Sequence, residues 1–314
     1  MAESWYSIIR DEMSSVDDVI RDEVRSAYPE LNDMCEATMR SRYHTVRPAL
    51  CILSYHLCGG KDRDLAIYTA SCFESVFEGL HLHDRIDSEG KVVGGKKKLF
   101  DKVPSTTKVI VAGDFMYLMG FRLAYAKAPK VVPYLMSASA SISDGIFMIA
   151  NKEHNPSVTE QDCMDITVKK GAIEYQTIMA CAAEQAGADD DAKAIMQDCG
   201  EYIGMALQIE SDLDDLFKDK PEMFTIKTGY PTLPIFYSMQ DPEYGERIRE
   251  LYSRKDLDQK EMADMVSMIK RTDATKRCEE LIVEYYSEAL KIINGLPASD
   301  YSKSLSDFVR NNLI

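Results

Sequence analysis

Apolar residues recur three and four positions apart along almost the whole of this 314-residue chain, a spacing typical of helices that each bury one face. Alternating β-branched runs, which strands would require, are few, whereas Met, Ala, Leu, Glu and Lys are plentiful. Neither an internal repeat nor a low-complexity linker divides the sequence. We therefore expect an all-α protein that folds as a single domain over residues 1–314.

Prolines, glycines and capping residues mark the ends of the expected helices. Pro48 is expected in the first turn of a helix that begins at Ala49. Ser157 and Glu160 stand at the spacing of a capping box. The expected helices cover residues 4–27, 32–42, 49–57, 62–87, 106–127, 134–150, 160–187, 191–217, 233–240, 243–254, 259–270 and 273–294, and a short segment covers 300–313.

The helix expected over 191–217 ends in a cluster of carboxylates. Asp212 and Asp215 are three residues apart and share one helical face, where like charges repel unless a cation lies between them. Oxygen ligands favour a hard cation such as Mg²⁺, which takes one or two carboxylates plus phosphate oxygens. Lys220 and Lys227 follow in a loop and could meet a metal-bound phosphate. The alternative is a solvated acidic helix end followed by an ordinary loop.

The segment that follows Gln208 resembles the second aspartate-rich region of the trans-prenyltransferases, the polyprenyl diphosphate synthase family. The family pattern reads Q-I-x-D-D-x-x-D, then G-K-P, an Asp and G-K-x-TLP. The matching positions are Gln208, Asp212, Asp215, Lys220, Pro221, Gly229 and Thr232–Pro234. Two positions depart from it, because Ser211 replaces the first aspartate and Thr225 replaces the later one.

Further motifs extend the resemblance over roughly residues 30–240. Residues 112–115 match the family's A-G-D-F, and Lys170-Gly171-Ala172 matches K-T-A with Gly for Thr. The resemblance implies that Lys170 faces the diphosphate of an allylic substrate. The alternative is a surface lysine beside Lys169.

The first aspartate-rich region is degraded, and its register stays open. In one register Asp84 takes the first aspartate position and Arg85 replaces the second. In the other, His83 takes the first position and Asp87 the last. A guanidinium here would repel Mg²⁺ but could bind phosphate oxygens directly. The alternative is a helix end of mixed charge.

The pocket that holds isopentenyl diphosphate in this family is largely altered. Arg47 is retained, whereas His44 replaces a lysine, Phe77 replaces a histidine, and residues 93–95 read V-G-G where R-R-G belongs. Neighbouring cations that could compensate are Arg42 and Lys96–Lys98. We therefore expect an allylic diphosphate to bind far better than isopentenyl diphosphate.

The resemblance implies the isoprenoid-synthase bundle, in which helices surround a central apolar cavity and two acidic helix ends face each other across its mouth. Mg²⁺ is the implied cofactor, and an allylic prenyl diphosphate is the implied ligand. The implied metal ligands are Asp84, Asp87, Asp212 and Asp215. The implied substrate contacts are Arg47, Lys170, Gln208 and Lys220. The implied catalytic residues are Asp84, Lys170 and Asp212, which would stabilise the departing diphosphate.

Gly79, five residues before Asp84, implies room for a long product, although Phe73 and Phe77 could refill that space.

Composition excludes several other functions. The net charge of −15, with no basic stripe, argues against nucleic acid as a partner. Eight scattered cysteines without a C-x-x-C are typical of reduced thiols in a cytoplasmic protein. The acidic start is not that of a signal peptide, and no run of about 18 uncharged apolar residues predicts a membrane span.

Two functions from different classes remain open. The first is an Mg²⁺-dependent enzyme that elongates an allylic prenyl diphosphate, or ionises and cyclises it. The second is a catalytically impaired subunit that regulates an active prenyltransferase paralogue. The two retained Asp-x-x-Asp pairs favour the enzyme. We expect a homodimer or a heteromer with a paralogue, and the sequence predicts no product length.

Overall fold

The computed structural model describes residues 5–39, 43–87, 89–93, 105–218 and 223–313. Within these ranges the regular structure is helical, and the β-type pairing is limited to an isolated bridge between Ile86 and Val92. The prediction of an all-α fold is confirmed.

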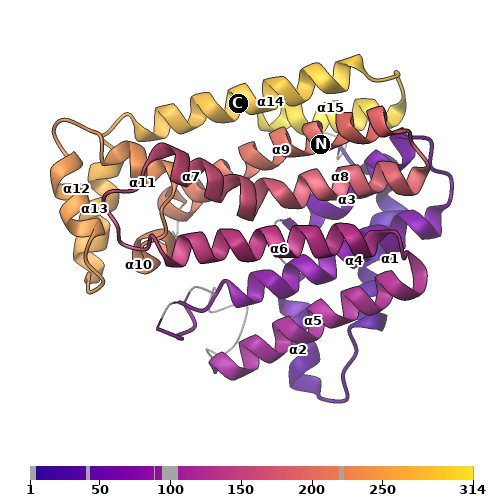
Figure 1. Ribbon diagram of the computed structural model, residues 1–314, viewed down its shortest axis with the longest axis horizontal. Coiled ribbons are helices and arrows are strands. Elements are labelled where there is room, and N and C mark those ends of the chain that lie inside the picture. Colours follow the sequence, from indigo (N-terminus) through magenta and orange to yellow (C-terminus); the bar gives the residue numbers. More distant parts are fainter. Residues whose placement is uncertain (1–4, 40–42, 88, 94–104, 219–222, 314) are drawn as a thin grey trace.

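Long helices run lengthwise through the molecule, most plainly α6, α8 and α14 (Figure 1). The N-terminal part contains α1 (Arg10–Glu23), α2 (Pro29–Thr38), α3 (Tyr43–Leu57), α4 (Arg63–His83), α5 (Thr106–Lys127) and α6 (Val131–Ala150). The C-terminal part contains α7 (Glu160–Ile166), α8 (Ile173–Ala186), α9 (Asp190–Phe217), α10 (Phe224–Thr228), α11 (Leu233–Ser238), α12 (Gly245–Tyr252), α13 (Gln259–Ile269), α14 (Ala274–Gly295) and α15 (Asp300–Asn312). A π-helix over Thr167–Ala172 joins α7 to α8.

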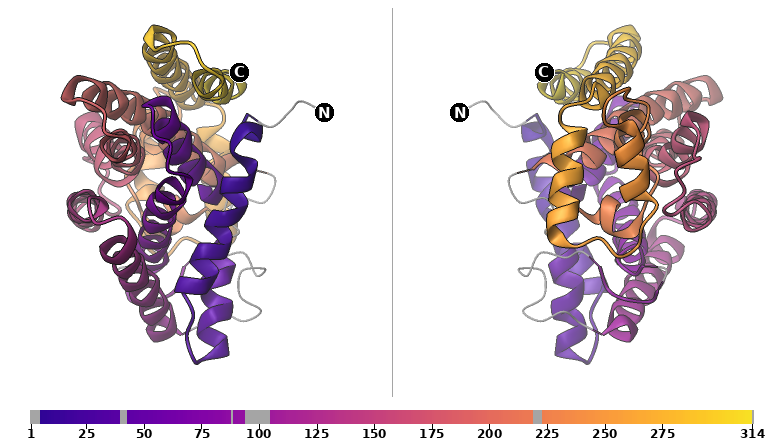
Figure 2. Two further views of the ribbon diagram at one scale, coloured as in Figure 1. Left: turned by 90° about the vertical axis from the view of Figure 1, so that its right-hand side faces the viewer. Right: turned by 90° about the vertical axis from the view of Figure 1, so that its left-hand side faces the viewer.

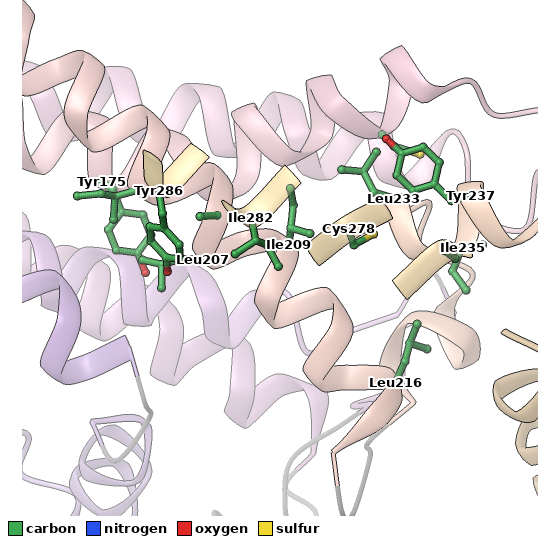
Figure 3. Packing of buried hydrophobic residues seen from close by; sticks show 14 of the residues in the cluster. Tyr175, Leu207, Ile209, Leu216, Leu233, Ile235, Tyr237, Cys278, Ile282 and Tyr286 are labelled. Carbon is green, nitrogen blue, oxygen red and sulfur yellow. The ribbon is translucent and has the colours of Figure 1, made fainter. Parts of the chain in front are cut away.

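The core consists of two large apolar clusters that meet along α8. One is built mainly from α1 to α6, and the other from α8, α9 and the helices after α10. Figure 3 shows the second cluster, in which Leu207 and Ile209 of α9 lie near Ile282 of α14. The two ends of the chain meet on one side of the molecule (Figure 2), where the rings of Trp5 and Phe308 are 4.5 Å apart.

Glycine allows α4 and α5 to pack backbone to backbone near the end of α4. A Cβ on Gly79 would lie 2.7 Å from the carbonyl oxygen of Gly113 and 2.9 Å from the amide nitrogen of Tyr117. The space beside Gly79 is therefore filled by α5, and the expectation that Gly79 leaves room for a long product is wrong. Phe73 and Phe77 are buried in the same packing layer, with ring centroids 5.7 Å apart.

Most expected helices appear within a few residues of their predicted bounds, and the exceptions have local causes. Pro48 lies inside α3, because the helix already begins at Tyr43. The capping box before α7 is formed by Thr159 and Asp162, two residues later than predicted. The short α10 and the π-helix carry no apolar periodicity of their own, and the sequence analysis missed both.

Two helices, α5 and α6, are long and apolar enough by length and composition to cross a membrane. Charged residues interrupt both helices, among them Asp114 in α5 and Asp144 in α6, so neither is an uncharged apolar run. Both helices also bury apolar side chains in the first core cluster, among them Val109, Met116 and Leu135. Because core helices of soluble proteins pass the same test, the absence of a membrane span stays a prediction.

Candidate functional site

A cavity of about 310 Å³ lies between α4, the π-helix, α9 and the segment that contains α10. Polar and charged side chains line much of it: Arg47, Glu78, His81, Asp84, Arg85, Lys170, Glu174, Gln208, Asp212 and Asp215. Apolar side chains line the rest, including Val93, Ile149, Ile166, Leu207 and Phe224. The cavity therefore joins the two acidic helix ends to an apolar wall.

Asp84 stands directly after α4 and is held as a largely buried anion. Its Oδ2 lies 3.2 Å from Nζ of Lys170 and 3.7 Å from Nδ1 of His81. Burial alone would raise the pKa of Asp84, but the two neighbouring cations lower it to about 2. Its Oδ1 is buried and has no hydrogen-bond partner among the described residues. That oxygen is a hard ligand whose remaining contacts are unsatisfied.

Asp212 lies on the α9 wall of the same cavity, in a different environment. Its Oδ1 accepts a hydrogen bond of 2.9 Å from Nε2 of Gln208. Burial raises the pKa of Asp212 to about 7, because the neutral amide of Gln208 and the more distant charge of Lys170 offset only part of the desolvation.

Lys170 connects the two aspartates electrostatically. It lies in the π-helix, and its Nζ sits 4.8 Å from the centroid of the Tyr230 ring. Burial would lower the pKa of Lys170, yet Asp84 and its other neighbours raise it to about 12. The π-helix approaches α9 closely, since a Cβ on Gly171 would lie 2.6 Å from Oε1 of Gln208. Single-turn π segments often occur at functional sites.

The second aspartate of each pair is engaged by nearby backbone. Oδ1 and Oδ2 of Asp215 accept hydrogen bonds of 2.9 and 2.8 Å from the amides of Phe224 and Thr225, at the start of α10. Oδ1 of Asp87 accepts hydrogen bonds from the amides of Glu89 and Lys91. Both residues thus organise a loop beside the cavity, and ligation of a metal would compete with these hydrogen bonds.

Arg47 reaches the cavity with its charge already paired. Its guanidinium donates to both carboxylate oxygens of Glu74, to Oε1 of Glu78 and to Oε2 of Glu174. Its side chain is only 2% exposed. Oε1 of Glu174 lies 2.8 Å from Nε2 of His81. We call these five residues the Arg47 cluster: Arg47, Glu74, Glu78, His81 and Glu174.

The side chains that line the cavity could supply part of the coordination shell of Mg²⁺. Mg²⁺ commonly takes one or two carboxylates and completes its shell with water and phosphate oxygens. Asp84 and Asp212 could supply those carboxylates. No ready-made group of three or more His, Cys, Asp or Glu ligands occurs in the described part of the chain. The site therefore suits a cation that arrives with a phosphate ligand.

The predicted site residues divide into three groups. Those on the cavity wall are Arg47, Asp84, Lys170, Gln208, Asp212 and Asp215. Asp87 lies in the loop after α4 and does not line the cavity. The candidates that fall outside the described residues are Arg42, Lys96–Lys98 and Lys220. The chemical roles assigned to all of these residues stay predictions.

Sequence reasoning missed the carboxylates around Arg47 and the ring over Lys170. Glu74 and Glu78 are four residues apart, so they share one face of α4. Both stand among apolar neighbours, as Glu174 does in α8, and such an isolated charge signals a buried partner. No comparable signal marks Tyr230.

Comparison of the sequence with protein families gives a match over residues 28–269 to the family described as polyprenyl synthetase. The heptaprenyl diphosphate synthase component 2 of Geobacillus stearothermophilus is 23% identical over 310 residues, which cover 97% of this chain and 96% of that protein. The octaprenyl diphosphate synthase of Escherichia coli (strain K12) is 24% identical over 246 residues, 76% of each chain.

Solved structures show the same fold. A decaprenyl diphosphate synthase from Rhodobacter capsulatus superposes with a TM-score of 0.85 at 18% identity, over 98% of this chain and 97% of that one. A polyprenyl synthase from Caulobacter crescentus CB15, complexed with calcium and isoprenyl diphosphate, gives 0.86 at 19% identity, over 98% and 96%. The helical arrangement described above is therefore that of the polyprenyl synthases, as the sequence resemblance implied.

Proposed function

This chain belongs to the polyprenyl synthetase family, and from that premise we propose that it is an enzyme that acts on an allylic prenyl diphosphate with Mg²⁺. One observation carries the proposal. The buried carboxylate of Asp212 and the largely buried carboxylate of Asp84 line a single cavity with the largely buried cation Lys170. A metal-bound diphosphate needs hard oxygen ligands and a cation within one pocket.

Each residue of the pocket then has a defined task. When bound, Mg²⁺ would neutralise the diphosphate and so make it a better leaving group. Asp84 and Asp212 would hold that ion. Lys170 would place a fixed positive charge on the diphosphate oxygens, where negative charge increases as the C–O bond breaks. The ring of Tyr230 restricts where the lysine can point.

The apolar wall suits the hydrocarbon part of such a substrate. Ile149, Ile166 and Leu207 line the cavity beside the charged groups. Packing a prenyl chain against them would exclude water from the reacting carbon and strengthen the electrostatic contacts. The structure from Caulobacter crescentus, which holds calcium and isoprenyl diphosphate, offers a family precedent for a divalent cation with this ligand class.

Calorimetric titration with a non-hydrolysable allylic thiolodiphosphate tests this function. We expect Mg²⁺-dependent binding that disappears in EDTA and falls strongly in Asp212→Asn. A matched control is Asp214→Asn, because Asp214 is a neighbouring aspartate that pairs with Lys218 outside the cavity. The metal-dependent site would be refuted if the thiolodiphosphate bound equally well with Mg²⁺ and with EDTA. It would also be refuted if wild type and Asp212→Asn bound it with equal affinity.

We also propose that the chain works as a homodimer or as a heteromer with a paralogue. The large apolar side chains that are exposed on α5 and α6 support this: Ile110, Val111, Leu118, Tyr125, Met136 and Phe147. Exposed apolar surface of this extent marks interaction sites. The name of the Geobacillus relative, component 2, is consistent with a heteromer. Sedimentation of wild type and Phe147→Arg tests this, and a monomeric wild type would exclude the homodimer.

A further inference from the structure

The segment that follows α10 forms part of the cavity wall and carries the ring that contacts Lys170. Tyr230, Pro231 and Thr232 all line the cavity. The centroid of the Tyr230 ring lies 4.8 Å from Nζ of Lys170 and 5.1 Å from the centroid of the Phe224 ring. A cation this close to the face of an aromatic ring is attracted by it. The position of this ring therefore limits where the charge of the lysine lies.

The backbone just before this ring is held from α12. The carbonyl oxygen of Gly229 accepts a hydrogen bond of 2.6 Å from Oη of Tyr252 and one of 3.0 Å from the amide of His154. Because a carbonyl oxygen has two lone pairs, both of its acceptor sites are used. Tyr252 belongs to α12, is fully buried and does not line the cavity. It therefore contacts the cavity wall through Gly229.

His154 and Gly229 interlock around this hydrogen bond. Gly229 has a φ of +69°, and a Cβ there would lie 2.4 Å from Cδ2 of His154. His154 itself has a φ of +54°, which is uncommon outside glycine. Its Nδ1 donates a hydrogen bond of 2.9 Å to the carbonyl of Tyr252, since a carbonyl can only accept. Backbone in this conformation persists where surrounding contacts hold it, and here three residues hold one another.

The start of α10 is held from the opposite direction, by α9. The two carboxylate oxygens of Asp215 accept hydrogen bonds from the amides of Phe224 and Thr225. The amide of Tyr230 in turn donates a hydrogen bond of 3.1 Å to the carbonyl of Thr225. The five-residue helix is thus fixed at its start by α9 and just beyond its end by α12. Loss of either connection would free the backbone that carries the ring of Tyr230.

We propose that Tyr252 is a positioning residue for the reaction, because its bond to Gly229 sets the ring of Tyr230 and, through that ring, the charge of Lys170. This inference rests on the proposed function, in which Lys170 contacts the leaving diphosphate. It gives a task in the reaction to α12, a helix outside the cavity.

The position of the lysine charge matters because electrostatic stabilisation needs a fixed charge. Negative charge increases on the diphosphate as the C–O bond breaks, and a preorganised cation has its greatest effect at that moment. A displacement of about 1 Å, caused by a change far from the reacting atoms, can cost about 10²-fold in rate. The loss should appear in kcat and not in KM, since this contact strengthens in the transition state.

The first test compares two buried tyrosines by diphosphate release from an allylic diphosphate with Mg²⁺. Tyr252→Phe deletes the hydroxyl that binds Gly229 and keeps the ring, while the amide of His154 still satisfies the carbonyl. We expect kcat to fall about tenfold at unchanged KM, less than a full misplacement would cost.

Tyr237→Phe is the matched control, because the buried hydroxyl of Tyr237 donates to Glu160 and neither residue lines the cavity. This variant should lose stability to urea without losing kcat. The inference would be overturned by an equal fall of kcat in both variants, or by an unchanged kcat in Tyr252→Phe.

A double-mutant cycle separates positioning from a general loosening of the fold. Tyr230→Leu removes the ring through which Tyr252 is proposed to act. In that background Tyr252→Phe should change kcat by less than about twofold, because the connection from Gly229 to Lys170 is already broken. An independent structural effect would lower kcat by the same factor in both backgrounds, and that result would overturn the inference.

The wild-type protein distinguishes failure of this inference from failure of the proposed function. If wild type neither binds an allylic thiolodiphosphate nor releases diphosphate with Mg²⁺, both fail. If wild type is active and the cycle is additive, the inference alone fails. If Tyr252→Phe does not fold, as judged by circular dichroism, His154→Asn replaces it in the cycle. Asn tolerates the positive φ and removes the Nδ1 donor to Tyr252, so the same dependence on the ring of Tyr230 is expected.

Discussion

The acidic ends of α4 and α9 place their aspartates in similar ways, but the pKa values of those aspartates are shifted in opposite directions. Each has an aspartate on the cavity wall, Asp84 or Asp212, and another three residues later that accepts hydrogen bonds from backbone amides. Of these later aspartates, Asp215 also lines the cavity and Asp87 does not. The pKa of Asp84 is lowered to about 2, whereas that of Asp212 is raised to about 7. Burial acts against the anion at both positions, so the neighbours decide the outcome.

The difference lies in the charge of those neighbours. Asp84 touches a lysine and a histidine, while Asp212 touches the neutral amide of Gln208. The carboxylate of Asp84 is therefore stabilised as an anion within the protein. The desolvation of ionised Asp212 is offset only in part until a cation binds. Buried aspartates at matching positions of a motif can thus affect stability in opposite directions.

Removing the cation that Asp84 and Asp212 share should have the largest effect. Lys170→Met keeps the length of the side chain and deletes its charge. If Lys170 binds the leaving diphosphate, kcat/KM for diphosphate release should fall about 10²–10³-fold, as for other electrostatic contacts of this kind. Lys169→Met is the matched control, because Lys169 pairs with exposed Asp144. Comparable losses in both variants would show that only the general charge of this region matters.

Asp84→Asn should destabilise the fold. It leaves Lys170 without the carboxylate that pairs with it in a largely buried site, whereas His81 keeps Glu174, and breaking such a pair costs about 3–5 kcal/mol. Urea denaturation at pH 7 measures the change. Asp114→Asn, an exposed partner of His83, should cost at most about 1 kcal/mol. A loss from Asp84→Asn no greater than that of this control would contradict a buried, paired anion.

Asp212→Asn should instead raise stability, and increasingly so with pH. The pKa of Asp212 is about 7 in the folded protein, whereas the ordinary pKa of an aspartate is 3.8. The stability that protonated Asp212 confers is therefore complete below pH 4 and is lost as pH rises through 7. Each pH unit in this window is worth at most about 1.4 kcal/mol. Urea unfolding at pH 5 and pH 8 tests this. If the gain in unfolding free energy of Asp212→Asn were smaller at pH 8 than at pH 5, the raised pKa of Asp212 would be contradicted.

Much of this architecture followed from sequence, because helix periodicity and caps are local signals. The helix over 106–127 was predicted with its exact bounds, and that over 191–217 begins one residue earlier in the structure. The family resemblance also located Asp84, Lys170 and Asp212, which the structure brings to one cavity.

The contacts around Arg47 could not be predicted in the same way. Glu74 and Glu174 are a hundred residues apart in the chain and meet only through the packing of α4 and α8 against α3. The pKa difference between Asp84 and Asp212 likewise depends on burial and on which neighbour carries charge. The spacing of residues within a motif indicates neither the burial of an aspartate nor the charge of its neighbours in space. Asp84 and Asp212 therefore appeared equivalent in the sequence.

The smallest expected effect concerns the aspartate that follows Asp212 by three positions. Asp215→Asn retains one acceptor oxygen but loses the second, so one amide at the start of α10 is left without its partner. The loss should be about 0.5–2 kcal/mol, comparable to loss of a helix N-cap. It should have the opposite sign to the effect of Asp212→Asn. Urea unfolding of both variants at pH 8 makes the comparison, and a gain of stability in Asp215→Asn would contradict the stabilising role given to these two hydrogen bonds.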